Sequence, residues 1–332
     1  ILEFKKAILL KPDYDEAIYN QSHVYLELHQ YSLGWVGYEK RIQMEDFDVK
    51  PLPGIEVWDG GVIGRGKLLV RGEQGLGDQI LFGTTLRELE GKVGGVVLQV
   101  DERLVGLFRR SFPNFEVIGG KDPIPAGVEK QVMIGSLPQY YRRSVEEFEK
   151  AKIPYLESDQ ARTKRYREQL KGSGGGLVVG LSWRSFNNRN EARKSIELLE
   201  MWPLFRIPGV KVVDLQYGET EEEKKRARIA GCRFEEGLGV DVTNDLDGLA
   251  SLIDACDVIV TVSNTTAHVA GALGKPVILM LPERIGRMWY WVSHEGRSSL
   301  WYPTVKSVQQ KDADGWGEVV ERVVEELKAR VQ

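Results

Sequence analysis

A glycine-punctuated loop follows the strand-like run at residues 67–72 and carries two carboxylates, Glu73 and Asp78. Gly75 and Gly77 allow the backbone to turn sharply and to approach a ligand closely, and the helix expected next points its N-terminus at the loop. Either carboxylate could act as a general base that takes a proton from a reacting hydroxyl. The helix N-terminus favours the charged form of Asp78 and so weakens it as a base, which keeps Glu73 as a second candidate.

Two other interpretations of this loop are open. Gly75 and Gly77 match the first two glycines of the dinucleotide fingerprint G-x-G-x-x-G, and Asp101 stands where the ribose acid is expected. However, Ile80 replaces the third glycine, and Asp78 would repel a pyrophosphate from the same N–H groups. An NAD-dependent oxidoreductase is therefore the weaker prediction, and the plainest alternative is that Asp78 only caps its helix.

A better candidate for a phosphate site follows the strand-like run at residues 257–262. Ser263 and Asn264 are good N-cap residues, and the helix expected after them has no acidic residue in its first two turns. Its free N–H groups would bind an anion, with the hydroxyls of Thr265 and Thr266 beside them. His268 leans back toward the helix start and could reach the same anion, or it could be a partly buried structural histidine.

A cationic loop follows the strand-like run at residues 176–183. It carries Arg184, Arg189, Arg193 and Lys194 ahead of a helix that begins near Ser195. At the carboxyl end of a strand such charges would neutralise a diphosphate, although a loop of this kind is often only solvated. We therefore include Arg184, Arg193 and Lys194 among the residues that are candidates for binding a diphosphate.

The elements that must position these residues alternate between strand-like and helix-like runs from residue 67 onward. This pattern is typical of parallel sheets covered on both faces. The glycine-rich stretch at residues 172–176 indicates a hinge. We expect an α/β fold with two Rossmann-like domains, at residues 51–172 and 173–332, facing a cleft that holds the site, because ligands lie beyond the carboxyl ends of parallel strands.

Residues 1–50 differ from the rest, because apolar and aromatic residues recur there at helical spacing with a break around residues 29–32. This predicts a pair of helices, and the order of its motifs resembles a tetratricopeptide repeat, whose unit is about 34 residues. One repeat cannot bury its own face, so the segment packs on the body or belongs to a longer array. A plain helical hairpin is the alternative.

The composition favours no charged macromolecule as a partner. The 45 basic and 49 acidic residues of the 332 give a net charge of −4, which offers no global attraction for nucleic acid or an anionic membrane. No apolar run is long enough to span a bilayer and no leader pattern opens the sequence, so the expected location is cytoplasmic. Cys232 and Cys256 lack metal-binding spacing and are expected to be buried free thiols.

Six short motifs, spread over nearly the whole chain, carry a resemblance to a known family. They are EQGLGDQ at residues 73–79, GLSW at 180–183, KSIEL at 194–198, DLQ at 214–216, SNTTAHVAGALGKP at 263–276 and WYP at 301–303. Their order and spacing resemble bacterial tetratricopeptide-repeat glycosyltransferases related to the ADP-heptose:lipopolysaccharide heptosyltransferases. The resemblance implies the two-domain GT-B fold and metal-independent, inverting transfer of a sugar from a nucleotide diphosphate, with no further cofactor.

The same resemblance assigns roles to residues. It implies Asp78 as catalytic base, Lys194 or Arg193 as the cation on the donor phosphates, and the helix start with His268 as the phosphate site. Ser182 and Gln216 belong to its motifs and join the donor-binding candidates. Heptosyltransferases commonly have Asp-Thr-Gly at residues 263–265, whereas Ser-Asn-Thr stands here, so heptose specificity is not implied.

Other classes of function also leave traces. Asp-x-Asp pairs occur at residues 13/15, 46/48, 245/247 and 312/314, each in a turn or helix start where aspartate is expected for capping rather than for metal binding. An aromatic-rich segment at residues 283–305 could stack a base or sugar, or seal a junction. The predicted partners are a nucleotide-sugar donor, a glycan or protein acceptor, and a protein bound by the helical segment. The rival prediction is a non-catalytic interaction scaffold with a vestigial transferase body.

Overall fold

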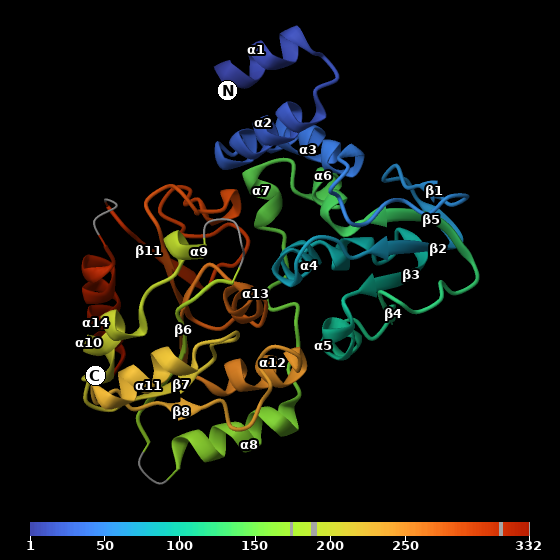
Figure 1. Ribbon diagram of the computed structural model, residues 1–332. Coiled ribbons are helices and arrows are strands. Elements are labelled where there is room, and N and C mark those ends of the chain that lie inside the picture. The colour runs from blue at the N-terminus through green and yellow to red at the C-terminus, as the bar shows by residue number, and fades with distance from the viewer. Residues whose placement is uncertain (173–174, 187–190, 312–314, 332) are drawn as a thin grey trace. The chain divides into compact units, whose positions relative to one another are not determined.

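The computed structural model describes residues 1–172, 175–186, 191–311 and 315–331, with the backbone alone at 191 and 192 (Figure 1). The contacts within the chain divide it into two compact units, Ile1–Tyr155 and Leu156–Gln332. Each unit contains one parallel sheet, which confirms the predicted α/β fold with two parallel sheets.

The first unit begins with a helical segment. Its elements are α1 (Leu2–Leu10), α2 (Asp15–Glu27), α3 (Tyr31–Tyr38) and the short 3-10 helix η1 (Glu39–Gln43). The expected helix pair is present as α2 and α3, whereas its assignment as a tetratricopeptide repeat stays a prediction. The segment packs on the rest of the unit through Trp35, whose indole Nε1 donates a 2.6 Å hydrogen bond to the carbonyl of Arg142.

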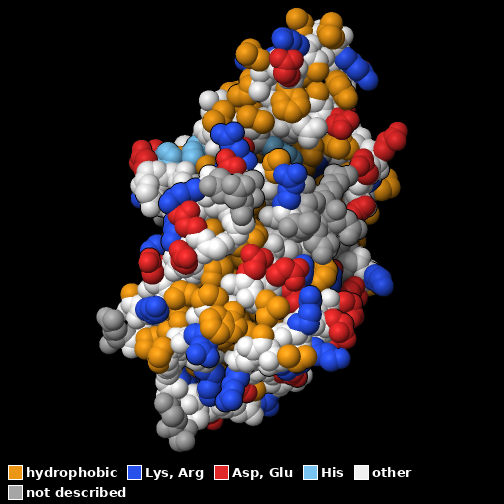
Figure 2. Space-filling model, turned by 60° about the vertical axis from the view of Figure 1, so that its left-hand side comes forward, with side chains coloured by type: hydrophobic (Ala, Val, Ile, Leu, Met, Phe, Trp, Pro, Cys, Tyr) orange, Lys and Arg blue, Asp and Glu red, His pale blue; other side chains and the backbone are white. Residues whose placement is uncertain are grey.

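The outer face of this helical segment is apolar. Figure 2 shows hydrophobic side chains gathered at the top of the view, over the N-terminal helices. Its exposed large apolar residues are Ile1, Leu2, Leu9, Leu10, Tyr14, Leu28, Leu33 and Val36. α1 buries none of its residues within the structure, so most of this apolar surface faces outward.

The sheet of the first unit has the strand order β1-β5-β2-β3-β4, with every neighbouring pair parallel. Its strands are β1 (Glu56–Val57), β2 (Ile63–Arg71), β3 (Val93–Val100), β4 (Glu116–Gly119) and β5 (Val128–Met133). Its helices are α4 (Leu76–Gly83), α5 (Val105–Ser111), α6 (Pro138–Tyr141) and α7 (Val145–Phe148). The central run Leu68–Val70 has no exposed surface, as expected for a strand covered on both faces.

The sheet of the second unit has the order β11-β10-β9-β6-β7-β8, again all parallel. Its strands are β6 (Leu177–Ser182), β7 (Val210–Asp214), β8 (Glu235–Glu236), β9 (Val258–Val262), β10 (Val277–Leu281) and β11 (Val305–Gln309). Its helices are α8 (Gln160–Lys171), α9 (Glu191–Lys194), α10 (Trp202–Phe205), α11 (Glu221–Ile229), α12 (Leu246–Ala255), α13 (Thr265–Ala272) and α14 (Gly317–Val331). The strand order reverses between β6 and β9, and ligands of open sheets bind at such a switch point.

The second unit begins earlier than the glycine-rich stretch where the sequence indicated a boundary. α8 precedes that stretch, yet it packs on α12, and Arg162 on α8 forms a 2.6 Å ion pair with Asp245 at the start of α12. The boundary implied by composition therefore lies one helix too late. Composition marks where the chain is rich in glycine, and not which sheet a flanking helix covers.

Two further features concern the cysteines and the apolar character of the helices. Cys232 and Cys256 are both buried and form no disulfide, as predicted. Among the described residues, no helix is both long and apolar enough to cross a membrane.

Candidate functional site

The loop between β2 and α4 makes a tight turn at the carboxyl end of β2. A Cβ atom on Gly72 would lie 2.6 Å from the side-chain oxygen of Gln79, so only glycine fits there. Gln74 has φ +58, in the left-handed region that non-glycine residues rarely adopt. The N–H of Gly75 then donates a 3.1 Å hydrogen bond to the carboxylate of Asp78. The half-buried Asp78 thus caps its own helix and still reaches the surface.

Glu73 is enclosed in the same turn. Its carboxylate receives Nε and Nη2 of Arg41, at 3.1 and 2.6 Å, and the N–H of Gly135 at 2.8 Å. Both charged residues are only 1% exposed. A carboxylate fixed by three donors and shielded from solvent is a structural group, so the geometry leaves Asp78 as the candidate base in this loop.

Arg41 was not expected from the sequence, because its partner lies 32 residues away in another element. Burial alone would lower the pKa of Arg41, but the adjacent carboxylates of Glu73 and Glu39 raise it above its ordinary value. Its Nη2 also donates to the hydroxyl of Ser136 at 2.8 Å. The guanidinium therefore joins the helical segment to the glycine loop and to the end of β5.

In the second unit, an amide network ties three strand ends together. The side-chain oxygen of Gln216 accepts the N–H groups of Trp183 and Arg184, at 2.7 and 2.8 Å, and the hydroxyl of Ser182 at 3.1 Å. The amide nitrogen of Asn264 donates to Ser182 at 2.8 Å and to the carbonyl of Arg184 at 3.0 Å. Ser182 and Gln216, two of the predicted donor-binding residues, are therefore hydrogen-bonded to each other and shape the turn after β6.

The start of α13 lies beside this network, at the carboxyl end of β9. The Asn264 side chain accepts the N–H of Ala267 and so caps the helix, as its sequence position predicts. No acidic residue lies in the first turn. Thr265 is half-buried, and Thr266 is fully buried with a hydroxyl that has no hydrogen-bond partner among the described residues. A buried hydroxyl beside free helix N–H groups is available to an anionic ligand.

His268 is not one of the cations of this site. It is 3% exposed, and aromatic rings of Tyr290, Trp291 and Tyr302 lie 5.0 to 5.9 Å from its ring centre. Burial lowers the pKa of His268 to about 3, so the ring is neutral at physiological pH. The structure therefore favours the structural histidine of the two interpretations, and the aromatic segment seals it in.

The aromatic segment also touches the helix start. Trp291 lies in the short 3-10 helix η6 (Trp289–Trp291) and donates its Nε1 to the hydroxyl of Ser263 at 2.9 Å. Lys194, only 4% exposed, lies against the same segment, with its Nζ 3.6 Å from the sulfur of Met288. The ammonium of Lys194 is thereby held on the side of the sheet where α13 begins.

The other cations of the loop separate. Arg184 pairs with Glu223 at 2.6 Å and with Glu197, so its charge is already matched. Arg193 is exposed and lines a pocket. Arg189 lies outside the described residues.

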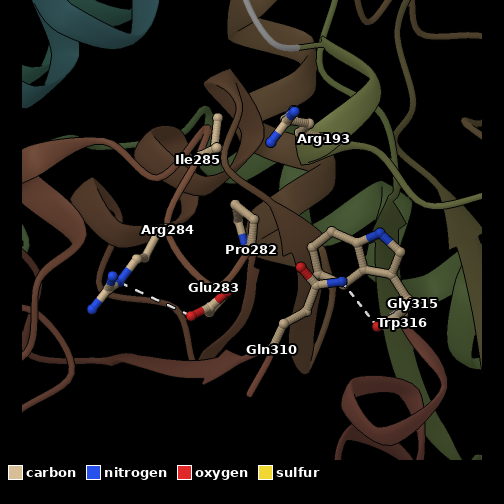
Figure 3. A pocket seen from close by; sticks show the side chains of 8 residues that line it. All are labelled: Arg193, Pro282, Glu283, Arg284, Ile285, Gln310, Gly315 and Trp316. Atoms are coloured by element: carbon tan, nitrogen blue, oxygen red, sulfur yellow. Dashed lines mark hydrogen bonds and ion pairs between the residues drawn. The ribbon is translucent and has the colours of Figure 1, made fainter. Parts of the chain in front are cut away.

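That pocket has a volume of about 510 Å³ and lies beyond the carboxyl ends of β10 and β11 (Figure 3). It is lined by Arg193, Pro282, Glu283, Arg284, Ile285, Gln310, Gly315 and Trp316. Because it adjoins β10 and β11, the pocket lies toward one edge of the sheet rather than at the switch point between β6 and β9.

A smaller pocket of about 280 Å³ lies on the opposite side, after β7. It is lined by Arg184, Phe186, Glu219, Thr220, Glu222, Glu223 and Arg226. The hydroxyl of Thr220 is buried there without a hydrogen-bond partner among the described side chains. Carboxylates and a free hydroxyl can accept and donate hydrogen bonds to the hydroxyls of a sugar ring.

The acidic pairs noted in the sequence are used locally. Asp245 accepts the N–H of Gly248 at 2.7 Å, as a helix cap, and pairs with Arg162. The pair at residues 312/314 lies outside the described residues. In the described ranges, no three His, Cys, Asp or Glu side chains are grouped so that they could hold a metal ion.

No known protein-family model matches this chain. One curated relative, Protein FlbA of Caulobacter vibrioides, is 30% identical over 330 residues, which cover 92% of this chain and 54% of FlbA. The chain therefore spans about half the length of the curated relative it matches.

Solved structures similar to this chain include three transferases. ADP-heptose LPS heptosyltransferase II of E. coli has a TM-score of 0.54 at 16% identity, over 80% of this chain and 98% of that one. A family 9 glycosyl transferase of Veillonella parvula has a TM-score of 0.52 at 13% identity, over 82% and 100%. The dodecameric iron-containing glycosyltransferase TibC of E. coli H10407 has 0.53 at 12% identity, over 82% and 78%. At such identities the likeness establishes the α/β fold with two parallel sheets.

Proposed function

We propose that the chain is a glycosyltransferase that moves a sugar from a nucleotide diphosphate sugar to a hydroxyl of a glycan or protein, with inversion and without a metal ion. The observation that carries this proposal is the acid-free start of α13, where the buried Thr266 hydroxyl has no partner among the described residues. The neighbouring heptosyltransferase and glycosyltransferase folds support the same class of reaction.

The diphosphate would lie at the start of α13. There the free N–H groups and the helix dipole favour negative charge, and Thr265 and Thr266 supply hydroxyl donors. Lys194 would supply a cation to the same phosphates: its Nζ lies 3.6 Å from the sulfur of Met288, in the aromatic segment whose Trp291 donates to Ser263 at this helix start. These groups would stabilise the charge that develops on the departing phosphate oxygen, which is the role a metal ion plays elsewhere.

The ribose of the donor would lie in the 280 Å³ pocket after β7. Glu219 and Glu222 line it and can accept hydrogen bonds from ribose hydroxyls, while the Thr220 hydroxyl can donate one. We assign no part of the donor to the larger pocket near β10 and β11.

Asp78, in the first unit, would be the base. The acceptor hydroxyl attacks the anomeric carbon from the face opposite the nucleotide, and its proton passes to the Asp78 carboxylate. A new carbon–oxygen bond forms while the bond to the phosphate oxygen breaks, and that oxygen keeps the electron pair. Inversion follows from this single displacement. Glu73 is not proposed as a base because Arg41 and Gly135 occupy its carboxylate.

The nature of the donor is tested by thermal shift. We expect one of UDP, GDP or ADP, or its sugar, to raise the melting temperature in the presence of EDTA, because a ligand that binds only the folded state stabilises it. NAD serves as the comparison for the oxidoreductase alternative. No shift with any nucleotide would contradict the proposal and favour the scaffold.

The position of the site is tested with Thr266→Val, which removes only the buried hydroxyl. Loss of a hydrogen bond to a charged group costs about 1.5 to 3 kcal/mol, so the affinity for the nucleotide diphosphate should fall roughly 10-fold to 100-fold. Thr163→Val on α8 is the matched control, since its hydroxyl bonds to Ser158 and not to the start of α13. An unchanged affinity in Thr266→Val would place the phosphates elsewhere.

A further inference from the structure

The helical segment contacts the glycine loop at two successive residues, Glu73 and Gln74. The first contact is the buried pair of Arg41 with Glu73, in which two nitrogens of the guanidinium meet the two carboxylate oxygens. The pair is backed by Gly135, where an added Cβ would lie 2.3 Å from the Glu73 carboxylate. Glu73 therefore has one position open to it, and that position is set by a residue of the helical segment.

The second contact fixes the next residue of the loop. The amide nitrogen of Gln74 donates a 2.9 Å hydrogen bond to the hydroxyl of Tyr38, the last residue of α3. Gln74 has φ +58, a conformation that L side chains avoid unless other contacts hold them there. Tyr38 is 2% exposed, so its hydroxyl is a fixed anchor.

The two anchoring residues, Arg41 and Tyr38, also contact each other. The guanidinium carbon of Arg41 lies 4.5 Å from the centre of the Tyr38 ring, a cation–π contact. Tyr38 also packs at 6.1 Å against Phe82 of α4, the helix that Asp78 caps. The helical segment thus holds both the turn that precedes Asp78 and the helix that follows it.

We infer that Arg41 and Tyr38 are positioning residues that hold the Glu73–Asp78 loop in its working conformation, so that the helical segment is part of the acceptor side of the site. The catalytic consequence of this inference rests on the proposed function. The structural part does not, because it concerns the order of the loop alone. A module that only recruited a protein would not need to bury an ion pair against this turn.

The test compares Tyr38→Phe with Tyr31→Phe. Each change removes one phenolic hydroxyl from α3, but Tyr31 packs on Phe148 and not on the loop. We expect amide hydrogen exchange at residues 72–79 to be faster than in the wild type in Tyr38→Phe and in Arg41→Lys. In Tyr31→Phe we expect exchange at these residues to be unchanged. Unchanged exchange at residues 72–79 in both variants would overturn the inference.

Turnover supplies the second readout. A small misplacement of a reacting group is costly, so Tyr38→Phe should lower kcat for transfer about 10-fold, while the affinity for the nucleotide diphosphate stays the same. Combining Tyr38→Phe with Gln74→Ala should lower kcat no further than the larger single change, because both remove one hydrogen bond. Faster exchange with an unchanged kcat would overturn the catalytic role. If the wild type transferred no sugar, the proposed function would fail, and the exchange result would still decide whether the segment holds the loop.

Discussion

Two strand–turn–helix junctions of this protein look alike, but only one of them holds a carboxylate at its helix start. In the first unit, the turn from β2 to α4 carries Asp78, whose carboxylate accepts the Gly75 N–H and so occupies its own helix N-terminus. In the second unit, the turn from β9 to α13 is capped by the neutral Asn264, and its first turn has no acid.

The charge at a helix start decides which ligand the junction can bind. A helix start that already holds a carboxylate repels a phosphate, whereas an acid-free start attracts one. In the proposed function, the first junction offers a base to an acceptor and the second holds a nucleotide diphosphate.

The largest effect is expected from Asp78→Asn, which removes the base and keeps the shape of the first junction. General-base catalysis contributes about 10²-fold to 10⁴-fold, so sugar transfer should fall by that factor. Nucleotide affinity should not change, because the proposed donor-binding groups belong to the second unit. Asp159→Asn is the control, since the Asp159 carboxylate also accepts backbone N–H groups at a helix start, as the N-cap of α8. Wild-type transfer rates in Asp78→Asn would remove the base from this junction.

Arg41→Ala removes the buried ion pair that holds Glu73 in the first junction. It leaves Glu73 as a buried, uncompensated charge, and breaking such a pair costs about 3 to 5 kcal/mol of unfolding free energy. The neighbouring Lys40 pairs with Asp15 at the surface, so Lys40→Ala should cost only about 0 to 1 kcal/mol. Chemical denaturation of both variants measures the difference. Equal losses of unfolding free energy would show that the buried pair stabilises the fold no more than the surface pair does.

Thr265→Asp turns the second junction into a copy of the first. Aspartate suits a first helical turn, so the fold should be kept, but its charge should weaken nucleotide diphosphate binding about 10-fold to 100-fold. Thr265→Asn, of the same shape and neutral, should bind within about threefold of wild type. Titration calorimetry at two salt concentrations measures the effect, and equal affinities in the two variants would show that no anion binds there.

The stability of the protein at low pH should depend on the buried His268. Its folded-state pKa is about 3, below the ordinary 6.5, so between these values the unfolded chain binds a proton that the folded chain does not. Stability from this residue is complete above pH 6.5 and is lost as the pH falls, by at most about 1.4 kcal/mol per pH unit. The difference in unfolding free energy between wild type and His268→Phe should follow this slope. A difference that is independent of pH from 4 to 7 would show that His268 titrates normally.

Local patterns predicted much of this architecture. Buried apolar runs such as Val258–Val262 and Val277–Leu281 predicted parallel strands, and the cap at Asn264 followed from residue type and spacing. These features depend on neighbours within a few residues, which a sequence displays directly.

Partners that are distant in the chain could not be predicted in this way. Glu73 was a candidate base until Arg41, from the helical segment, was found on its carboxylate. His268 was a candidate cation until rings more than twenty positions later, among them Trp291, were found around it. In both cases burial against a remote element decided the role, and no local pattern reports such burial.

The most direct test of the division between the two junctions is a calorimetric titration of one nucleotide diphosphate, the one that shifts the melting temperature, into Asp78→Asn and Thr265→Asp side by side. We predict wild-type affinity in Asp78→Asn and a large loss in Thr265→Asp. A loss of affinity in Asp78→Asn with full binding in Thr265→Asp would contradict the account, because the nucleotide would then lie at the first junction.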